Sequence, residues 1–172
     1  LEGANGPGAG KTLVLDLAGH TLTAKEGERV FVTSGNLVIN DSSGDNCGKL
    51  TGGSAANNSG GAVMIYGGGT LTLNGGTITG NTANVEGGGV FVNGYGTFNL
   101  QDGTISNNKS TASKNISYHY GGGGVYSNGH LYLSGGTITG NTATADGNGV
   151  FVKRSASVTL SGDVQIKDNI KD

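Results

Sequence analysis

Apolar and polar residues alternate in short stretches along nearly the whole chain, which is the pattern of half-buried β-strands. In six stretches a pair of apolar residues is separated by a single residue: Leu13/Leu15, Leu37/Ile39, Leu71/Leu73, Phe98/Leu100, Leu131/Leu133 and Val158/Leu160. Each pair predicts a strand with one face turned to a core. The pairs divide the chain into six units, of which the last is incomplete.

Each unit continues with two further apolar segments. After a glycine-containing turn comes a short strand centred on one aliphatic residue: Leu22, Leu50, Ile78, Ile105, Ile138 or Ile166. In most units a glycine run leads to the third segment: 30–32, 63–65, 90–92, 125–127 or 150–152. Every unit therefore predicts three short strands.

The units are also related in their residues. The nonapeptide GGTITGNTA occurs at 75–83 and again at 135–143, and a degenerate copy, DGTISNNKS, lies between them at 102–110. The basic unit is 27 residues long, which is the spacing from Leu71 to Phe98. A repeat of this length indicates a stack of similar units, because one unit alone cannot bury its apolar face.

Stacking these units predicts an all-β fold, a right-handed parallel β-helix of about six coils with three parallel sheets. We expect one domain over residues 1–172, with a glycine-rich lead-in at 1–10, coils over 11–172 and insertions near 41–49 and 109–120. The incomplete last unit suggests a segment of a larger protein with at least one open end.

Composition supports this fold and excludes several functions. The chain has 36 glycines and one proline, and the glycines stand at fixed places between the apolar segments, as turn residues do. The net charge is −2 with basic residues scattered singly, which excludes a nucleic-acid surface. No apolar run is long enough for a membrane span, so we expect no membrane insertion.

Two motifs carry a resemblance to known families. Gly-Gly-Ala-Val at 60–63 and Gly-Gly-Gly-Val at 87–90 and 122–125 alternate with Ile-x-x-Asn, and this resembles the GGAI and FxxN repeats of the chlamydial polymorphic outer-membrane-protein adhesins. The stretch 14–22, VLDLAGHTL, is similar to the strand-turn-strand that begins many pectate-lyase-like β-helices. The resemblance implies a bacterial surface protein of β-helical fold.

Polar residues at the turns suggest structural roles. One asparagine recurs at the same corner, where stacked amides form a hydrogen-bonded ladder: Asn81, Asn108, Asn141 and Asn169. The insertion at 41–49 places Asp41 and Asp45 close together, so Ca²⁺ is possible there, although a solvated acidic turn is the favoured interpretation. No other metal site is indicated.

Two features predict contact with a partner. Alternation in the third segment directs one large side chain per coil outward, giving an apolar stripe that implies a cover or a ligand: Phe31, Met64, Phe91, Tyr126 and Phe151. In the reversed register the valines of these segments would form the outer stripe, with the same implication. The insertion at 109–120 carries Tyr118, His119 and Tyr120, and a loop that projects from a rigid coil is a usual place for recognition. Packing of that loop against the neighbouring coil remains the alternative.

The second segment directs threonine and serine outward on both sides of its central residue: Thr21, Thr23, Thr77, Thr79, Thr104, Ser106, Thr137 and Thr139. Such a grid resembles the face with which β-helical antifreeze proteins order water. Threonine is also a good outward residue in any strand, and the grid is interrupted at 49–51 and 165–167. Ice binding is therefore an alternative function.

No catalytic residues are indicated, because the acidic residues do not recur as matched pairs and no Ser-His-Asp arrangement is apparent. We expect a non-catalytic, extracellular or cell-surface bacterial protein that presents a rigid surface. Its expected partner is a glycan, a host surface protein or another copy, reached through the apolar stripe or an open coil end. A polysaccharide lyase or glycoside hydrolase of the β-helix type is a further alternative.

Overall fold

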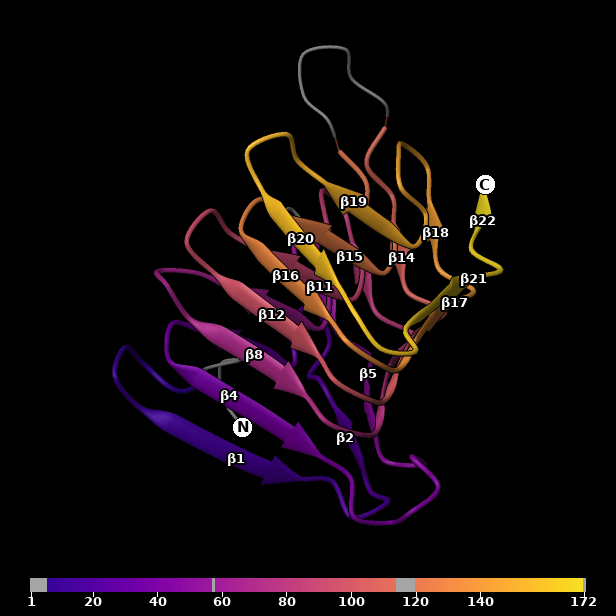
Figure 1. Ribbon diagram of the computed structural model, residues 1–172. Helices are drawn as coiled ribbons and strands as arrows, with labels where there is room; N and C mark the ends of the chain where they lie inside the picture. The colour runs from indigo at the N-terminus through magenta and orange to yellow at the C-terminus, as the bar shows by residue number, and fades with distance from the viewer. Residues whose placement is uncertain (1–5, 57, 114–119, 172) are drawn as a thin grey trace.

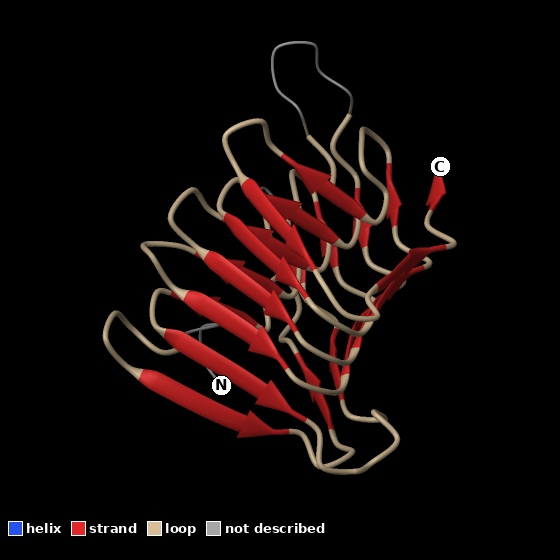
Figure 2. Ribbon diagram, viewed as in Figure 1, coloured by secondary structure: helices blue, strands red, loops and turns tan. Residues whose placement is uncertain are grey.

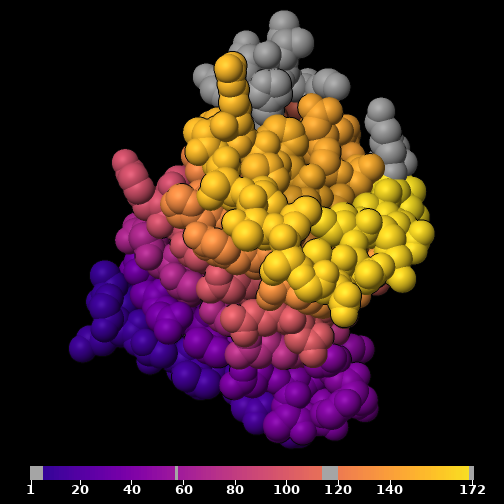
Figure 3. All heavy atoms as spheres, in the orientation of Figure 1, coloured from indigo at the N-terminus to yellow at the C-terminus, as the bar shows by residue number. Residues whose placement is uncertain are grey.

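The structure, a computed structural model, describes residues 6–56, 58–113 and 120–171. Every regular element within these residues is a β-strand, and no helix occurs among them (Figure 2). The strands form four parallel sheets, and in each sheet they follow one another in chain order (Figure 1). Figure 3 shows the same order at the surface, where colour runs along the stack from indigo to yellow. The chain is thus a parallel β-solenoid-like repeat.

The first two sheets have six strands each. The first sheet consists of β1 (Thr12–Asp16), β4 (Asn36–Asn40), β8 (Thr70–Leu73), β12 (Thr97–Leu100), β16 (His130–Leu133) and β20 (Ser157–Leu160). The second consists of β2 (Thr21–Thr23), β5 (Lys49–Thr51), β9 (Thr77–Thr79), β13 (Thr104–Ser106), β17 (Thr137–Thr139) and β21 (Gln165–Lys167).

The other two sheets have five strands each. The third sheet consists of the dipeptide strands β6 (Ser54–Ala55), β10 (Thr82–Ala83), β14 (Lys109–Ser110), β18 (Thr142–Ala143) and β22 (Ile170–Lys171). The fourth consists of β3 (Phe31–Thr33), β7 (Val63–Ile65), β11 (Val90–Val92), β15 (Val125–Ser127) and β19 (Val150–Val152).

The prediction of three sheets is wrong, and the reason lies inside the nonapeptide. Gly80 has a φ of +66°, a left-handed conformation that turns the chain directly after β9. The next two residues, Thr82 and Ala83, then pair with their equivalents in the neighbouring repeats and form a sheet of their own. TITGNTA is therefore two strands with a corner between them.

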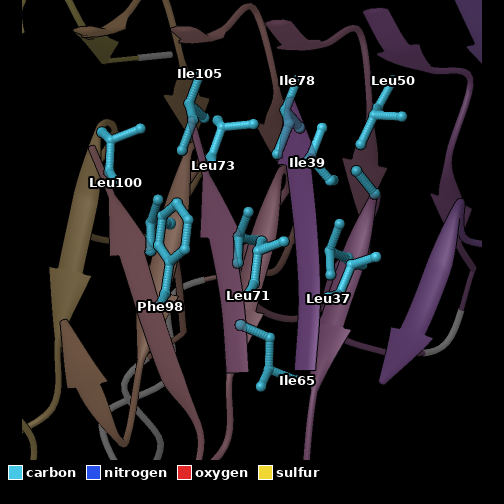
Figure 4. Packing of buried hydrophobic residues seen from close by; sticks show 14 of the residues in the cluster. Leu37, Ile39, Leu50, Ile65, Leu71, Leu73, Ile78, Phe98, Leu100 and Ile105 are labelled. Carbon is cyan, nitrogen blue, oxygen red and sulfur yellow. The ribbon is translucent and has the colours of Figure 1, made fainter. Parts of the chain in front are cut away.

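The core is a set of side-chain columns that run along the stack. Leu37, Leu71, Phe98 and Leu131 pair in register through the first sheet, and all four side chains are buried. Figure 4 shows Leu37, Leu71 and Phe98 beside Ile78 and Ile105 of the second sheet. Full burial of one such side chain stabilises the folded state by about 1.5–3 kcal/mol. The alternating apolar pairs of the sequence thus supply one wall of the core.

The corner between the second and third sheets holds a ladder of asparagine amides. Asn81 Nδ2 donates to Asn108 Oδ1 at 2.9 Å, Asn108 Nδ2 donates to Asn141 Oδ1 at 3.0 Å, and Asn141 Nδ2 donates to Asn169 Oδ1 at 3.0 Å. The first three amides are buried, with no more than 1% of their surface exposed. Since buried polar groups need partners, this ladder satisfies the corner and fixes its register.

The two ends of the stack expose side chains that stand in core columns. Leu13 of β1 is exposed at one end. Val158 and Leu160 of β20 and Ile166 of β21 are exposed at the other. Within the described residues these strands have a paired neighbour on one side only. Edges of this kind are where a further strand can pair.

Candidate functional site

The outer face of the second sheet carries the predicted threonine rows. Thr77, Thr104 and Thr137 pair in register in one row, and Thr79, Ser106 and Thr139 pair in the other. Ser106 Oγ donates to Thr79 Oγ1 at 3.4 Å. Toward the N-terminal end, Lys49 separates Thr21 from Thr77. Both hydroxyl rows therefore span β9, β13 and β17 and end at Gln165 and Lys167 of β21. On the other side Lys49 interrupts the first row, whereas Thr51 pairs with Thr23 in the second.

The outward row of the fourth sheet differs from the prediction at its first member. Phe31 pairs with Val63 and belongs to the core cluster, while Val32 pairs with Met64 and takes the outward position. The expectation that Phe31 faces outward is therefore wrong. The row consists instead of Val32, Met64, Phe91, Tyr126 and Phe151.

Two of the three aromatic side chains of this row, Phe91 and Tyr126, are covered by the protein itself, and Phe151 is half-buried. Phe91 and Tyr126 stack with ring centroids 5.6 Å apart, and Tyr126 and Phe151 stack at 5.0 Å. Only 9% of Phe91 and 2% of Tyr126 is exposed. Rings buried to this extent stabilise the sheet and have no free face to offer a sugar.

Glycine-rich turns lie against the same row. A Cβ atom at Gly122 would come within 2.8 Å of the Tyr126 Cβ, and one at Gly147 within 2.7 Å of the Phe151 Cβ. Burial raises the pKa of the Tyr126 phenol well above its ordinary value, and the nearby Glu86 carboxylate and its hydrogen bond raise it further. Tyr126 therefore stays neutral throughout the physiological pH range, as a buried packing residue should.

Of the three residues singled out in the long insertion, Tyr118 and His119 lie outside the described residues. Tyr120 is half-buried, and its carbonyl accepts a hydrogen bond from the Asp146 amide at 3.3 Å. This contact ties the end of the insertion to the next repeat.

Both carboxylates of the acidic insertion bind backbone amides. Asp41 accepts from the amides of Gly19 and Gly48, each at 2.7 Å, and Asp45 accepts from Cys47 at 3.2 Å. Desolvation acts to raise the pKa of Asp41, but these amide hydrogen bonds outweigh it and hold the pKa below its ordinary value. The two carboxylates thus stabilise a turn, and this geometry supports the solvated acidic turn over a Ca²⁺ site.

Exposed aromatic side chains occur around the first sheet, where the sequence pattern had not indicated them. Tyr132 stands on the outer face of β16 with 46% of its surface exposed. Tyr66 and Tyr95, exposed to 42% and 85%, lie in the connections that lead into β8 and β12. Threonine and asparagine occupy much of the same outer face. These three tyrosines and the outer face of the first sheet are called the tyrosine face below.

The tyrosine face also contains a hollow of about 290 Å³ that sequence reasoning missed. It lies where the fourth sheet connects to the first, across the turns that enter β1, β4 and β8, which are stacked along one edge in Figure 1. Lys11, Thr12, Ser34, Asn36, Gly68 and Thr70 line it. Beside the hollow, β3 and β4 are joined by two residues, whereas β7 and β8 are joined by four.

Neither the site chemistry nor the comparisons point to an enzyme family. No group of three or more His, Cys, Asp or Glu side chains within the described residues is placed to hold a metal ion. The same part of the chain contains no helix that could cross a membrane. Comparison with protein-family models, curated proteins and solved structures finds no match to this chain. A proposal for the function therefore rests on the fold and on the tyrosine face.

Proposed function

We propose that this chain is a non-catalytic, extracellular bacterial protein segment, adhesin-like in role, whose right-handed β-helix of about six coils presents a rigid binding surface. Parallel strands joined by a crossover are right-handed in nearly all proteins, which supports the hand of the coil. The in-register sheets and the covered aromatic row support rigidity. The proposed partner is a glycan or a host surface protein.

The tyrosine face is the observation that carries this proposal. Tyrosine combines a large apolar ring with a polar hydroxyl, and it is enriched at binding surfaces for that reason. Every other exposed large apolar side chain of the described residues belongs to a strand at one end of the stack, whereas Tyr66, Tyr95 and Tyr132 lie between the two ends. Around them, hydroxyl and amide groups recur along the strands, so the surface offers aromatic contact and hydrogen bonding together.

The proposal predicts that the exposed tyrosines are needed for binding. Wild-type protein should bind at least one ligand on a glycan array or a panel of host surface proteins. The double variant Tyr95→Ser, Tyr132→Ser should bind that ligand at least about tenfold more weakly, since exposed aromatic anchors contribute much of the energy at interfaces. Surface plasmon resonance measures both affinities.

The matched control is Lys153→Ser, an exposed residue in the β19–β20 connection. It should leave the affinity unchanged. Equal binding by the tyrosine double variant and the wild type would contradict the role of the tyrosine face, and binding to no ligand by any form would favour a purely structural stalk.

Ice binding is a second candidate, favoured by the in-register hydroxyl rows of β9, β13 and β17. Repeats stacked about 4.8 Å apart would give these rows a regular spacing. The candidate predicts thermal hysteresis and shaped ice crystals in a solution of the purified protein. Substituting Thr104→Leu at the centre of the grid should abolish both, and normal ice growth with the wild type would exclude this function.

Self-association is also proposed, at the ends of the stack rather than through the aromatic row. The exposed core-column residues Leu13, Leu160 and Ile166 support contact there. The burial of Phe91 and Tyr126 argues against contact through the row.

A further inference from the structure

Three polar side chains that line the hollow form no hydrogen bond with the described part of the chain, although the backbone amides around them are paired. Elsewhere on the outer face of the first sheet, polar side chains of adjacent strands or turns bond to each other. Asn74 Nδ2 donates to Asn40 Oδ1 at 2.9 Å, and Asn99 Nδ2 donates to Thr72 Oγ1 at 3.2 Å. The side chains of Ser34, Asn36 and Thr70 make no such bond among the described residues. Their donors and acceptors are therefore open to a ligand.

The charge at the rim is also uncompensated. Among the described residues the ion pair present is Lys25–Glu28, so the Lys11 ammonium has no carboxylate partner there. No acidic side chain lines the hollow. A single cation beside hydroxyl and amide groups favours a ligand that carries one negative charge together with hydroxyl groups.

A second corner of the same protein has a side-chain bridge at the corresponding position. β15 and β16 are also joined by two residues, Asn128 and Gly129, in the positions of Ser34 and Gly35. There the Asn128 side chain bonds across to the next connection, where Ser155 Oγ donates to Asn128 Oδ1 at 2.9 Å. Serine at position 34 is too short to make this bridge. The Asn128 side chain thus bridges two successive connections, and the Ser34 side chain makes no such bridge among the described residues.

The geometry points to a binding site in this hollow for a single-ring sugar acid, held by Lys11 through the carboxylate and by Ser34, Asn36 and Thr70 through the ring hydroxyls. The volume of about 290 Å³ lies just below the range of about 300–1,000 Å³ for small-molecule sites, which suits one ring rather than a chain. This inference rests on the proposed function, because it assigns a ligand class to part of the tyrosine face.

The test compares two probes of the same shape, methyl β-glucuronide and methyl β-glucoside, by titration followed in amide NMR spectra. We expect the glucuronide to bind in the millimolar range and to shift the amides of Lys11, Asn36 and Gly68. The neutral glucoside should bind at least about fivefold more weakly, since it lacks the carboxylate that pairs with Lys11. Inorganic phosphate should compete weakly, because it offers charge without the ring.

Two variants separate the contribution of the hollow's shape to glucuronide binding from the contribution of the Lys11 charge. Ser34→Asn reproduces the closed corner and should reduce glucuronide affinity at least about tenfold, while Lys11→Gln should reduce it to the level of the glucoside. The matched control Asn128→Ser opens the second corner and should leave the first site unchanged. Retained affinity in folded Ser34→Asn protein, or phosphate binding as tightly as the glucuronide, would overturn the assignment.

The glucuronide titration and the binding test of the tyrosine double variant can succeed or fail separately. If the tyrosine double variant loses its array ligand while Ser34→Asn has no effect on the glucuronide, the hollow assignment fails and the proposed function stands. If the glucuronide binds as expected while no array ligand depends on the tyrosines, the assignment of the hollow stands and the role given to the tyrosine face fails.

Discussion

Replacing Asn108 with alanine is expected to lower the free energy of unfolding by about 4 kcal/mol. The Asn108 side chain is 1% exposed and lies in the middle of the ladder. Its Oδ1 accepts from the backbone N–H and the Nδ2 of Asn81, and its Nδ2 donates to the Ile78 carbonyl and to Asn141 Oδ1. The substitution leaves several of these buried groups without a partner. A loss of this size corresponds to a melting temperature lower by about 10 °C.

The control for this prediction is Asn99→Ala, the same change on the outer face. Asn99 is half-exposed and makes one side-chain hydrogen bond, to Thr72 at 3.2 Å, so its loss should cost less than about 1 kcal/mol. Urea unfolding followed by circular dichroism compares the two variants. If they lose equal stability, the ladder is not what holds this corner together.

Gly88→Ala is expected to destabilise the protein by about 3 kcal/mol or more, or to prevent folding. A Cβ atom at this position would collide with the carbonyl oxygens of Lys109 and Gly123, which belong to the backbone and cannot rotate away. Gly61 and Gly123 stand in the same column and have the same kind of neighbour. The glycine runs are therefore needed because successive turns stack backbone against backbone.

Gly8→Ala is the matched control, because a Cβ atom there would meet nothing within 4 Å. It should change stability by less than about 0.5 kcal/mol. Thermal unfolding and the yield of soluble protein compare the two substitutions. Wild-type stability in Gly88→Ala would mean that the turns can separate, contrary to the tight stacking described above.

Much of the fold follows from the sequence because its core columns are set by local alternation. The pairs represented by Leu71 and Phe98 stand in register and buried, as their spacing indicates. The four-sheet arrangement was missed because a two-residue strand such as Thr82–Ala83 is too short to show alternation. Its boundary is set by the left-handed conformation of Gly80, which the residue type allows but does not require.

The sequence predicted the wrong face for Phe31, although its spacing from the next strand indicates the correct one. Phe31 lies six positions before Leu37, as Val125 lies six positions before Leu131, whereas Val63 lies eight before Leu71. Aligning the segments by residue type placed Val30 and Val32 inward, while aligning them by the length of the following connection places Phe31 inward. A one-residue shift moves each side chain to the other face of the strand.

The candidate site was less accessible to sequence reasoning. Phe91 and Tyr126 are buried where rings of adjacent repeats stack and where a glycine turn lies against Tyr126, and alternation within one strand carries no information about either contact. The hollow depends on three connections that are distant in sequence and on the short side chain of Ser34. Only comparison of Ser34 with Asn128, its equivalent in the other short corner, could have suggested that one corner is open.

The asparagine ladder has a direction. Each side-chain amide donates to the carbonyl oxygen of the asparagine that follows, so the amide dipoles point the same way and their fields add along the axis. At the start of the ladder the Gly53 amide donates to Asn81 Oδ1, and at the other end Asn169 directs its Nδ2 to the carbonyls of Ile138 and Lys167 alone. The stack is therefore polar, with two unlike ends: a repeat grafted after Asn169 must offer an acceptor to continue the ladder, whereas at the other end Gly53 has no side-chain oxygen that could accept a further bond.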